Sequence, residues 1–403
     1  MAKAILSLNA GSSSFKFALF ELKNSDHLIA TLRGEVASID STPHFTVHDT
    51  KGAILAEENW ARQAFDGLME KVITWIEARL SNDELLAIGH RVVHGGTDHI
   101  KPERASTALL AELDALVPLA PLHEPHNLAP IRAIAAARPK LQQVVCFDTA
   151  FHHSMPAVAA RFALPREYEA AGVRRYGFHG ISYEYIAARL RVIAPALAQG
   201  RVIVAHLGNG ASLCAMRDGR SIDTTMGFSA LDGLVMGTRC GNLDPGVILY
   251  LEQERGMTTE QIEDLLYRHS GLLGVSGGIA SDMRTLLASD DPRAKDAIEL
   301  FVFHIAREIG ALASSLNSLD GIVFTAGIGE HAPEIRARVC ARLAWLGVDL
   351  DADANSKDAE LISTSQSRIE VRVIPTDEED MIARHTLDTI KGNRGQPAEE
   401  RRS

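Results

Sequence analysis

Residues 4–20 read AILSLNAGSSSFKFALF, and this stretch decides the fold. Its two ends are rich in Ile, Leu and Phe, which is typical of β-strands, and its middle, NAGSSS, is small and polar. Residues 201–217, RVIVAHLGNGASLCAMR, repeat the same order of strand, small polar turn and strand. The repeat predicts a duplicated fold with a cleft between its two halves.

Strand-like and helix-like stretches alternate along the chain, which predicts an α/β fold with helices covering its sheets. AIGHRVV (87–93) and QQVVCFD (142–148) resemble strands, and residues 58–80 have apolar side chains near helical spacing. With 403 residues the chain is long enough for two domains. We expect an N-terminal domain over 1–150, completed by a helix at about 377–391. A C-terminal nucleotide-binding domain is expected over 151–376, and a frayed polar tail over 392–403.

Composition excludes several classes of protein. The net charge of −11 argues against a broad nucleic-acid-binding surface. The four cysteines are far apart and form no CxxC pair, which fits a reducing cytosol and indicates neither a disulfide framework nor a zinc site. The sequence contains no run of 18 apolar residues, so we predict no membrane span, and because the chain starts with a strand-like segment we predict no signal peptide. The expected location is the cytoplasm.

Three small-residue turns each follow a predicted strand. The turn Asn9–Ser14 with Lys16, the turn HLGNGAS (206–212) and the turn TAGIGEH (325–331) expose backbone N–H groups, which bind phosphate. A single such turn is as readily an ordinary hairpin, but three of them indicate a nucleotide site. The chain has no GxxxxGK[ST], HRD or DFG motif, so it is neither a P-loop enzyme nor a protein kinase.

Four charged or titratable residues stand out by their positions. Arg91 and Asp148 come at the ends of predicted strands, where open α/β sheets bind ligands. Arg239 lies between two glycines, and His179 lies between Phe178 and a glycine. The alternatives are a solvated arginine, a turn-capping aspartate and a structural histidine. The pair His90 and His94 lies on a predicted strand without the glutamate of HExxH, so we do not predict zinc.

A series of ordered motifs resembles the acetate kinase family over about residues 4–390. The motifs are NAGSSSFKF (9–17), HRVVHGG (90–96), APLHEPHN (120–127), FDTAFH (147–152), RRYGFHG (174–180), AHLGNGAS (205–212), MGTRCG (236–241), SDMR (281–284), TAGIGE (325–330) and PTDEE (375–379). The resemblance implies duplicated ribonuclease H-like (actin-like ATPase) domains with the active site in the interdomain cleft. It also implies reversible transfer of the ATP γ-phosphoryl group to acetate, giving acetyl phosphate and ADP, with Mg²⁺ or Mn²⁺ and a homodimeric assembly.

The resemblance assigns roles to residues by motif. Catalytic roles fall to Asp148, His179 and Arg239, and metal contacts to Asn9 and Glu378, with Glu379 as an adjacent alternative. The acyl substrate is expected to contact Arg91, Val93, Leu122, Phe178 and Ala230. Contacts with ATP or ADP are expected from Ser12, Ser14, Lys16, His206, Leu207, Gly208, Asn209, Gly210, Asp282, Met283, Arg284, Gly327, Ile328, Gly329, Glu330 and His331.

The sequence departs from the family pattern at a few positions. Ser229-Ala230 stands where the family usually has Thr-Pro, which widens the expected acyl pocket and keeps propionate as an alternative substrate. Ile181 and Tyr183 replace the usual Thr and His, and His331 replaces Asn. A non-enzymatic nucleotide-driven module, like actin or Hsp70, is a further alternative, although the motifs leave no room for an added domain. Because a carboxylic acid is ionised at neutral pH, the acceptor needs no general base, and we expect Asp148 to organise charge instead.

Overall fold

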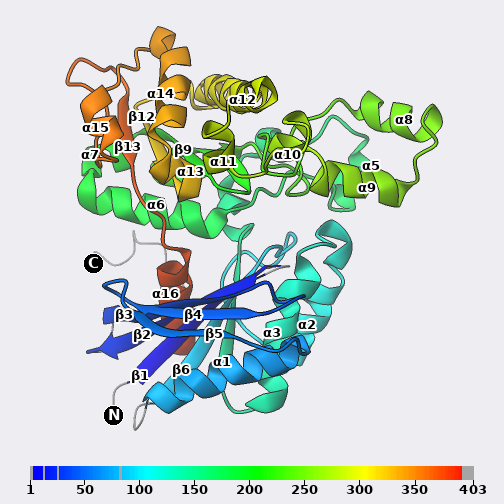
Figure 1. The fold of residues 1–403 in the computed structure, drawn as a ribbon, viewed down its shortest axis with the longest axis vertical. Helices are drawn as coiled ribbons and strands as arrows, with labels where there is room; N and C mark the ends of the chain where they lie inside the picture. Colours follow the sequence, from blue (N-terminus) through cyan, green and yellow to red (C-terminus); the bar gives the residue numbers. More distant parts are fainter. Residues whose placement is uncertain (1–2, 12–13, 25–26, 81–83, 393–403) are drawn as a thin grey trace. The chain divides into compact units, whose positions relative to one another are not determined.

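The chain folds into two compact units, described here from a computed structural model that covers residues 3–11, 14–24, 27–80 and 84–392. Unit 1 comprises the chain up to Ala150 together with the chain from Asp377 onward, and unit 2 comprises Phe151–Thr376 (Figure 1). Ser12 and all of the predicted tail except Gly392 lie outside the described residues. No helix in the described part of the chain is long and apolar enough to cross a membrane.

Unit 1 is built on an eight-stranded sheet with the order β5-β4-β3-β2-β1-β6-β8-β7. Strands β1 to β5 form antiparallel neighbours, whereas β6 is parallel to both β1 and β8. The strands are β1 (Lys3–Ala10), β2 (Ser14–Lys23), β3 (His27–Ala37), β4 (His44–Asp49), β5 (Ile54–Asn59), β6 (Glu84–Val92), β7 (Glu103–Arg104) and β8 (Gln142–Phe147). The helices are α1 (Phe65–Leu80), α2 (Thr107–Asp114), the 3₁₀ turn Val117–Leu119, α3 (Glu124–Ala137) and α16 (Glu378–Ile390).

Alternation along β1 and β2 sends side chains to both faces of this sheet, so both faces carry helices. Leu6, Leu8 and Phe17 pack with Val72 and Ile76 of α1. On the opposite face, the residues that pack with α16 are Ile5, Ala18 and Phe20, which contact Ala383 and Leu387. The C-terminal helix is therefore part of the core of unit 1 (Figure 1).

Unit 2 is built on a five-stranded sheet with the order β11-β10-β9-β12-β13. Its strands are β9 (Arg201–Leu207), β10 (Ala211–Arg217), β11 (Arg220–Thr224), β12 (Gly321–Thr325) and β13 (Glu370–Val373). The longer helices are α6 (Gly180–Ile193), α8 (Pro245–Gln253), α9 (Thr259–Arg268), α12 (Pro292–Leu316) and α14 (Pro333–Arg342). The short ones are α4 (Ala157–Ala160), α5 (Arg166–Ala170), α7 (Pro195–Ala198), α10 (Gly271–Val275), α11 (Met283–Leu287), α13 (Ala326–His331), the 3₁₀ turn Ala344–Leu346 and α15 (Ala352–Ser356). A further 3₁₀ turn, Ala150–Ser154, spans the boundary between the two units.

The two sheets share one topology. In unit 2, β9, β10 and β11 are antiparallel neighbours, and β9, β12 and β13 run parallel. In unit 1, β1, β2 and β3 are antiparallel in the same way, and β1, β6 and β8 run parallel. The duplicated α/β fold predicted from the two hairpins is therefore confirmed, with β4, β5 and β7 as additions to the first copy.

Two local predictions were wrong in part. The helix expected over 58–80 begins only at Phe65, because residues 54–59 pair with β4 as a further strand. The third glycine-rich turn, at 325–331, is the short helix α13. It starts immediately after β12 because Ala326 takes a left-handed conformation, with φ of 63°, and its N–H donates to the Glu330 carboxylate at 2.7 Å.

Candidate active site

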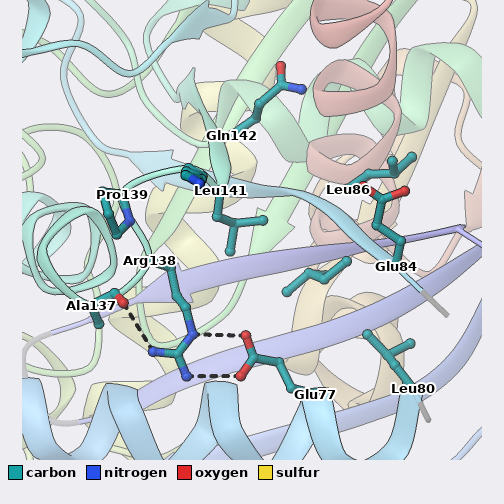
Figure 2. A pocket seen from close by; sticks show the side chains of 11 residues that line it. Glu77, Leu80, Glu84, Leu86, Ala137, Arg138, Pro139, Leu141 and Gln142 are labelled. Carbon is teal, nitrogen blue, oxygen red and sulfur yellow. Dashed lines mark hydrogen bonds and ion pairs between the residues drawn. The ribbon is translucent and has the colours of Figure 1, made fainter. Parts of the chain in front are cut away.

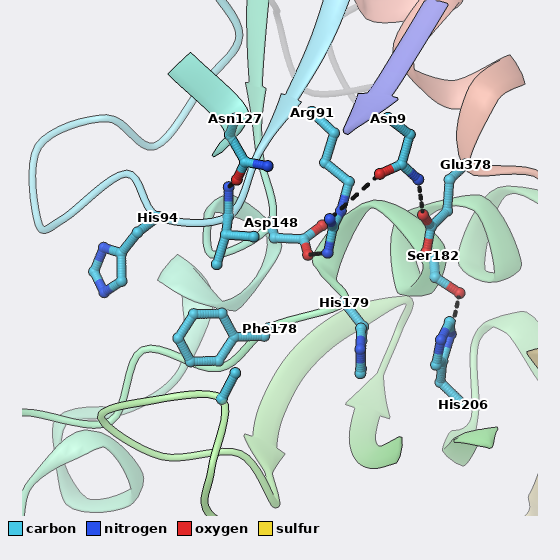
Figure 3. Close-up of polar contacts among 12 residues, drawn as sticks. Asn9, Arg91, His94, Asn127, Asp148, Phe178, His179, Ser182, His206 and Glu378 are labelled. Carbon is cyan, nitrogen blue, oxygen red and sulfur yellow. Dashed lines mark hydrogen bonds and ion pairs between the residues drawn. The ribbon is translucent and has the colours of Figure 1, made fainter. Parts of the chain in front are cut away.

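Unit 1 gathers four polar side chains at one edge of its sheet. Asn9 is near the end of β1, Arg91 is near the end of β6, and Asp148 directly follows β8. Because these three strands are parallel neighbours, their carboxyl ends meet at one edge, the place where α/β sheets bind ligands. Glu378, at the start of α16, joins them (Figure 3).

Arg91 and Asp148 form the centre of this group. The Asp148 side chain is fully buried, and its Oδ2 accepts from the Arg91 guanidinium. Among the described residues, Asp148 Oδ1 and Arg91 Nε are buried without a hydrogen-bond partner. Burial lowers the pKa of Arg91, but the nearby carboxylates of Asp148 and Glu378 outweigh it and hold that pKa above its ordinary value. Arg91 is therefore a permanent cation with a donor still unused.

Asn9 links Arg91 to Glu378. Its amide oxygen accepts from Arg91 at 3.3 Å, and its amide nitrogen donates to Glu378 at 2.9 Å. Burial raises the pKa of Glu378 to about 7, with Arg91 opposing and Asp148 adding to the shift. The adjacent carboxylate of Glu379 lies 3.6 Å from Arg33 instead. This arrangement favours Glu378 over Glu379 as the residue that acts beside Asn9.

Residues missed by the sequence analysis hold the segment that carries Val93. The Val93 N–H donates to Asn127 Oδ1 at 2.9 Å, and Asn127 donates to the Ala10 carbonyl at 2.6 Å. Glu124 accepts from the His94 N–H at 3.3 Å. Leu122 is half-buried immediately before α3. The signal was available, because Glu124 and Asn127 are polar residues in the motif APLHEPHN and their spacing places them on one side of a helix.

Both Glu124 and His94 are buried, and burial shifts their pKa values toward the neutral forms. Desolvation raises the pKa of Glu124 to about 8 and lowers the pKa of His94 to about 4. Glu124 therefore carries its proton at neutral pH and His94 does not. Together they form an uncharged pair, in which His94 is next to Val93 in the chain.

Unit 2 contributes a pair of stacked histidines. His179 precedes α6 with φ of 58°, a left-handed conformation that is rare outside glycine and costs about 1–3 kcal/mol. Its ring stacks on that of His206, with centroids 4.2 Å apart and planes 18° apart. Both rings are drawn in Figure 3. His206 occupies the end of β9, so the histidine predicted to act in catalysis lies beside the turn predicted to contact the nucleotide.

His179 and Arg239 converge on Gly210. A Cβ at Gly210 would lie 3.2 Å from His179 Nε2 and 3.9 Å from Arg239 Nη1. Arg239 also donates to the backbone carbonyl of Ala230 at 3.0 Å. Phe178 is buried beside them. The two side chains predicted to be catalytic therefore both approach the glycine of the second turn.

The second turn packs against further loops of unit 2, and α13 packs against α14. A Cβ at Gly237 would lie 2.0 Å from Asn209 Oδ1 and 3.0 Å from the Ser281 carbonyl, so MGTRCG and SDMR adjoin the turn formed by Leu207, Gly208 and Asn209. Asp282 caps α11, Met283 is buried and Arg284 is exposed. In α13, Gly327 and His331 are exposed, Ile328 is half-buried, and the Gly329 and Glu330 carbonyls accept from the buried Arg336.

The opening hairpin places Lys16 directly opposite Asn9. The two are partners in the β1–β2 ladder, and Lys16 is exposed while Ser14 is half-buried. The ladder therefore holds an exposed cation next to the group formed by Asn9, Arg91, Asp148 and Glu378.

A hollow of about 590 Å³ elsewhere in unit 1 is a separate feature (Figure 2). It is lined by Glu77, Leu80, Glu84, Leu85, Leu86, Ala137, Arg138, Pro139, Lys140, Leu141 and Gln142. The lining comes from the carboxyl ends of α1 and α3 and from the amino ends of β6 and β8. Glu84, at the start of β6, is a strand length of about 26 Å from Val92 at 3.3 Å per residue. Arg138 is already bound to Glu77 at 2.9 Å. We assign the hollow no part in the candidate site.

Comparison with known proteins gives a consistent result. The model of the acetokinase family matches residues 4–384. The chain is similar to an acetate kinase from Rhodopseudomonas palustris strain TIE-1, at 56% identity over 98% of this chain and 100% of that protein. Among solved structures it is similar to a propionate kinase from Francisella tularensis, with a TM-score of 0.89 and 37% identity, over 96% of this chain and 99% of that chain. It is also similar to the acetate kinase of Porphyromonas gingivalis, with TM-score 0.84, 34% identity and coverage of 96% and 100%.

Proposed function

Because the chain belongs to the acetokinase family, we propose that it transfers the γ-phosphoryl group of ATP reversibly to acetate, giving acetyl phosphate and ADP. The observation that carries the proposal is the buried pair Arg91–Asp148 at the carboxyl ends of parallel strands. It offers an anchored cation to a small carboxylate in a part of the fold where ligands bind. The two units serve as the functional domains, with the nucleotide assigned to unit 2. The predicted acceptor contacts are Arg91, Val93 and Leu122 in unit 1 and Phe178 and Ala230 in unit 2.

Asp148 acts on charge and orientation. An acetate ion is already deprotonated at neutral pH, so phosphoryl transfer needs positioning and charge stabilisation more than a base. Asp148 is fully buried and bound to Arg91, so it holds the guanidinium in one orientation. Arg91 in turn presents the donor that binds the acceptor carboxylate.

His179 and Arg239 are assigned to stabilise the phosphoryl group during its transfer. Charge spreads over the three equatorial oxygens of the phosphoryl group during transfer. Both side chains point toward Gly210, and both are donors of the kind that such oxygens accept. Lys16 and Ser14 are assigned to the phosphates, and the same prediction for Ser12 lies outside the described residues.

The nucleotide is assigned to the loops around β9 and β12. The first of these is the turn His206, Leu207, Gly208, Asn209 and Gly210. The others are Asp282–Arg284 and the helix α13, where the exposed residues Gly327 and His331 are free of side-chain cover. Backbone N–H groups in small-residue loops suit phosphates.

A divalent cation completes the proposal. Among the described residues, no three His, Cys, Asp or Glu side chains group as a metal site. Mg²⁺, however, is usually held by one or two carboxylates together with substrate phosphates. Glu378, Asn9 and the unused Asp148 Oδ1 supply oxygen donors of this kind, which Mn²⁺ also accepts. When bound, the ion would neutralise charge on the phosphates.

The acceptor test separates acetate from propionate. Ala230 replaces the proline usual in the family, and a structurally similar protein is a propionate kinase, so propionate is the second candidate. Val93 is retained and buried, which favours acetate. Purified protein with ATP and Mg²⁺ is given acetate, propionate or butyrate, and the acyl phosphate is trapped with hydroxylamine. Ala230→Pro is the matched variant.

We expect acetate to give the highest kcat/KM and Ala230→Pro to lower activity with propionate more than with acetate. One methylene is worth about 1–3 kcal/mol in such a pocket, so the preference is a matter of about 10- to 200-fold. Equal or higher kcat/KM for propionate would assign that acid as the substrate. Absence of product from every acid would refute the proposal.

A homodimer in the cytoplasm is the proposed state of the protein. Four consecutive apolar residues of α8, Val247–Tyr250, are each 38–52% exposed, and a second copy of this chain is the occupant that fits the family. Light scattering after size exclusion should give twice the 43.7 kDa chain mass. Leu249→Lys should shift it toward the single-chain mass.

A further inference from the structure

Tyr183 stands where the acetokinase family usually has histidine, and its hydroxyl lies beside the catalytic machinery of unit 2. Tyr183 is fully buried in the first turn of α6, the helix that His179 precedes. The phenol oxygen is 2.5 Å from Ser212 Oγ. Ser212 Oγ is in turn 2.8 Å from His179 Nδ1. Tyrosine, serine and histidine therefore form one continuous hydrogen-bonded chain.

The neighbouring histidine is held by the same device. His206 Nδ1 is 2.8 Å from Ser182 Oγ, and Ser182 Oγ is 2.9 Å from Thr376 Oγ1. Ser182 and Ser212 are both fully buried. For each of the two stacked histidines, a serine hydroxyl is therefore hydrogen-bonded to Nδ1, and a second hydroxyl is hydrogen-bonded to that serine.

The direction of the chain at His179 follows from what each group can do. A neutral imidazole carries N–H on only one ring nitrogen and accepts at the other. The nitrogen that faces Gly210 and Arg239 is Nε2, and phosphoryl oxygens need a donor there. Nδ1 must then accept, so the Ser212 hydroxyl must donate to it. When the Tyr183 hydroxyl donates its hydrogen to Ser212 Oγ, the Ser212 hydrogen must point away from the phenol and toward His179 Nδ1. Donation from Tyr183 also strengthens the hydrogen bond from Ser212 to His179.

We propose that Tyr183 is a positioning residue which, through Ser212, holds His179 in the tautomer with hydrogen on Nε2. The statement that His179 Nε2–H donates to the transferred phosphoryl group rests on the proposed function. The hydrogen-bond chain itself does not, since it can be tested on the resting protein.

The first test is spectroscopic. Full-length protein labelled with ¹⁵N-histidine is compared with Tyr183→Phe, which removes only the hydroxyl, and the His179 signals are identified by their loss in His179→Gln. We expect His179 in the wild type to have a protonated Nε2 and an unprotonated Nδ1. In Tyr183→Phe we expect the two tautomers to mix. The matched control is Tyr185→Phe, which removes a phenol oxygen from a half-buried position two residues along the same helix and should leave the His179 signals unchanged.

The second test is a kinetic double-mutant cycle. Tyr183→Phe should lower kcat about five- to tenfold, with KM for ATP and acetate changed by less than about twofold, since one hydrogen bond is lost and no substrate contact. Because Tyr183 acts through Ser212, adding Tyr183→Phe to Ser212→Ala should cause no further loss. A merely structural tyrosine would give additive losses.

Two results would overturn the proposal: unchanged His179 tautomers in Tyr183→Phe, or independent additive effects in the cycle. Failure of the proposed function is distinguishable from this. In that case the wild type would form no acyl phosphate, yet the tautomer shift between wild type and Tyr183→Phe would still be present.

Discussion

Arg91 and Asp148 form an ion pair in which the aspartate side chain is 0% exposed and the arginine side chain is 17% exposed. Removal of one partner from a buried pair costs about 3–5 kcal/mol because the other charge is left uncompensated. An asparagine at 148 keeps the shape of the side chain and loses the charge. The pair therefore offers a direct test of whether Asp148 organises charge or takes a proton.

Asp148→Asn should lower kcat by about 100-fold or more, because Arg91 loses the carboxylate that orients it. The pH profile of the residual activity should run parallel to that of the wild type between pH 6 and 9. The matched control is Asp114→Asn, which removes a carboxylate paired with Arg132 at half-exposed positions and should change kcat little. Recovery of Asp148→Asn activity at high pH would instead support a base role.

Glu124→Gln should alter the pH dependence of stability. Burial raises the pKa of Glu124 from 4.5 to about 8, so the folded chain keeps this proton over a range in which the unfolded chain releases it. Stability from this group is therefore full below pH 4.5 and is lost as pH rises toward 8, by at most about 1.4 kcal/mol per pH unit. Glutamine is neutral throughout, so the melting temperature of the variant relative to wild type should rise between pH 5 and 8.5.

The expected relative gain for Glu124→Gln is at least about 3 °C, given about 2–4 °C per kcal/mol for a folding unit of about 150–250 residues such as unit 1. Differential scanning calorimetry at the two pH values measures it. Glu84→Gln, at an exposed position at the start of β6, is the control and should show no such trend. A flat difference for Glu124→Gln would mean that Glu124 is ionised in the fold.

Gly89→Ala should destabilise unit 1. A Cβ at this position would lie 2.1 Å from Thr386 Oγ1 and 2.6 Å from Ile382 Cγ2, so α16 has to move away from β6. Overpacking of this kind costs about 1–3 kcal/mol. Because Glu378 begins the same helix, the variant should also require more Mg²⁺ for half-maximal activity.

Gly67→Ala is the control for this substitution. At Gly67, inside α1, a Cβ would meet only the end of the Gln63 side chain at 3.1 Å. Alanine there should stabilise the protein by about 0.5–1 kcal/mol, because it restricts the unfolded chain. Urea unfolding of both variants should give shifts of opposite sign, and shifts of the same sign would contradict the packing of α16 on Gly89.

Gly210→Ala should reduce activity and leave stability unchanged. The added methyl would lie 3.2 Å from His179 Nε2, in the space toward which Arg239 also points. A displacement on this scale costs about 10- to 100-fold in rate. Steady-state kinetics should show the loss in kcat, with a melting temperature within about 1 °C of wild type, and a variant with full activity would remove Gly210 from the site.

The elements that the sequence predicts best are those with strong local signals. Both hairpins are marked by apolar runs interrupted by small residues, and they determine the duplicated α/β class. The start of α1 was predicted several residues early, because the apolar residues within 58–80 lie near helical spacing, whereas Glu58 and Asn59 pair with β4. The helix α13 was read as a turn because Gly327 and Gly329 disfavour helix, although the Glu330 carboxylate, four residues along the same helix, accepts from the Ala326 N–H.

The candidate site shows the same division. Motifs indicated Arg91, Asp148, His179 and Arg239, and the roles assigned to them stay predictions, as does the expected cleft between the halves. The supporting residues were missed because their role depends on distant partners. Ser212 is one hydroxyl in the apolar strand ASLCAMR, and nothing local to it indicates His179, which lies 33 positions away.

The split of unit 1 between the two ends of the chain has a consequence for synthesis on the ribosome. The sheet face that carries Ile5, Ala18 and Phe20 is covered by α16, which is translated about 230 residues after β8. At a translation rate of about 5–20 residues per second, that face stays uncovered for roughly 10–45 s before α16 has been synthesised. A nascent chain that ends before Asp377 should therefore bind a hydrophobic dye or a chaperone through this face, and release should follow once residues 378–390 have emerged.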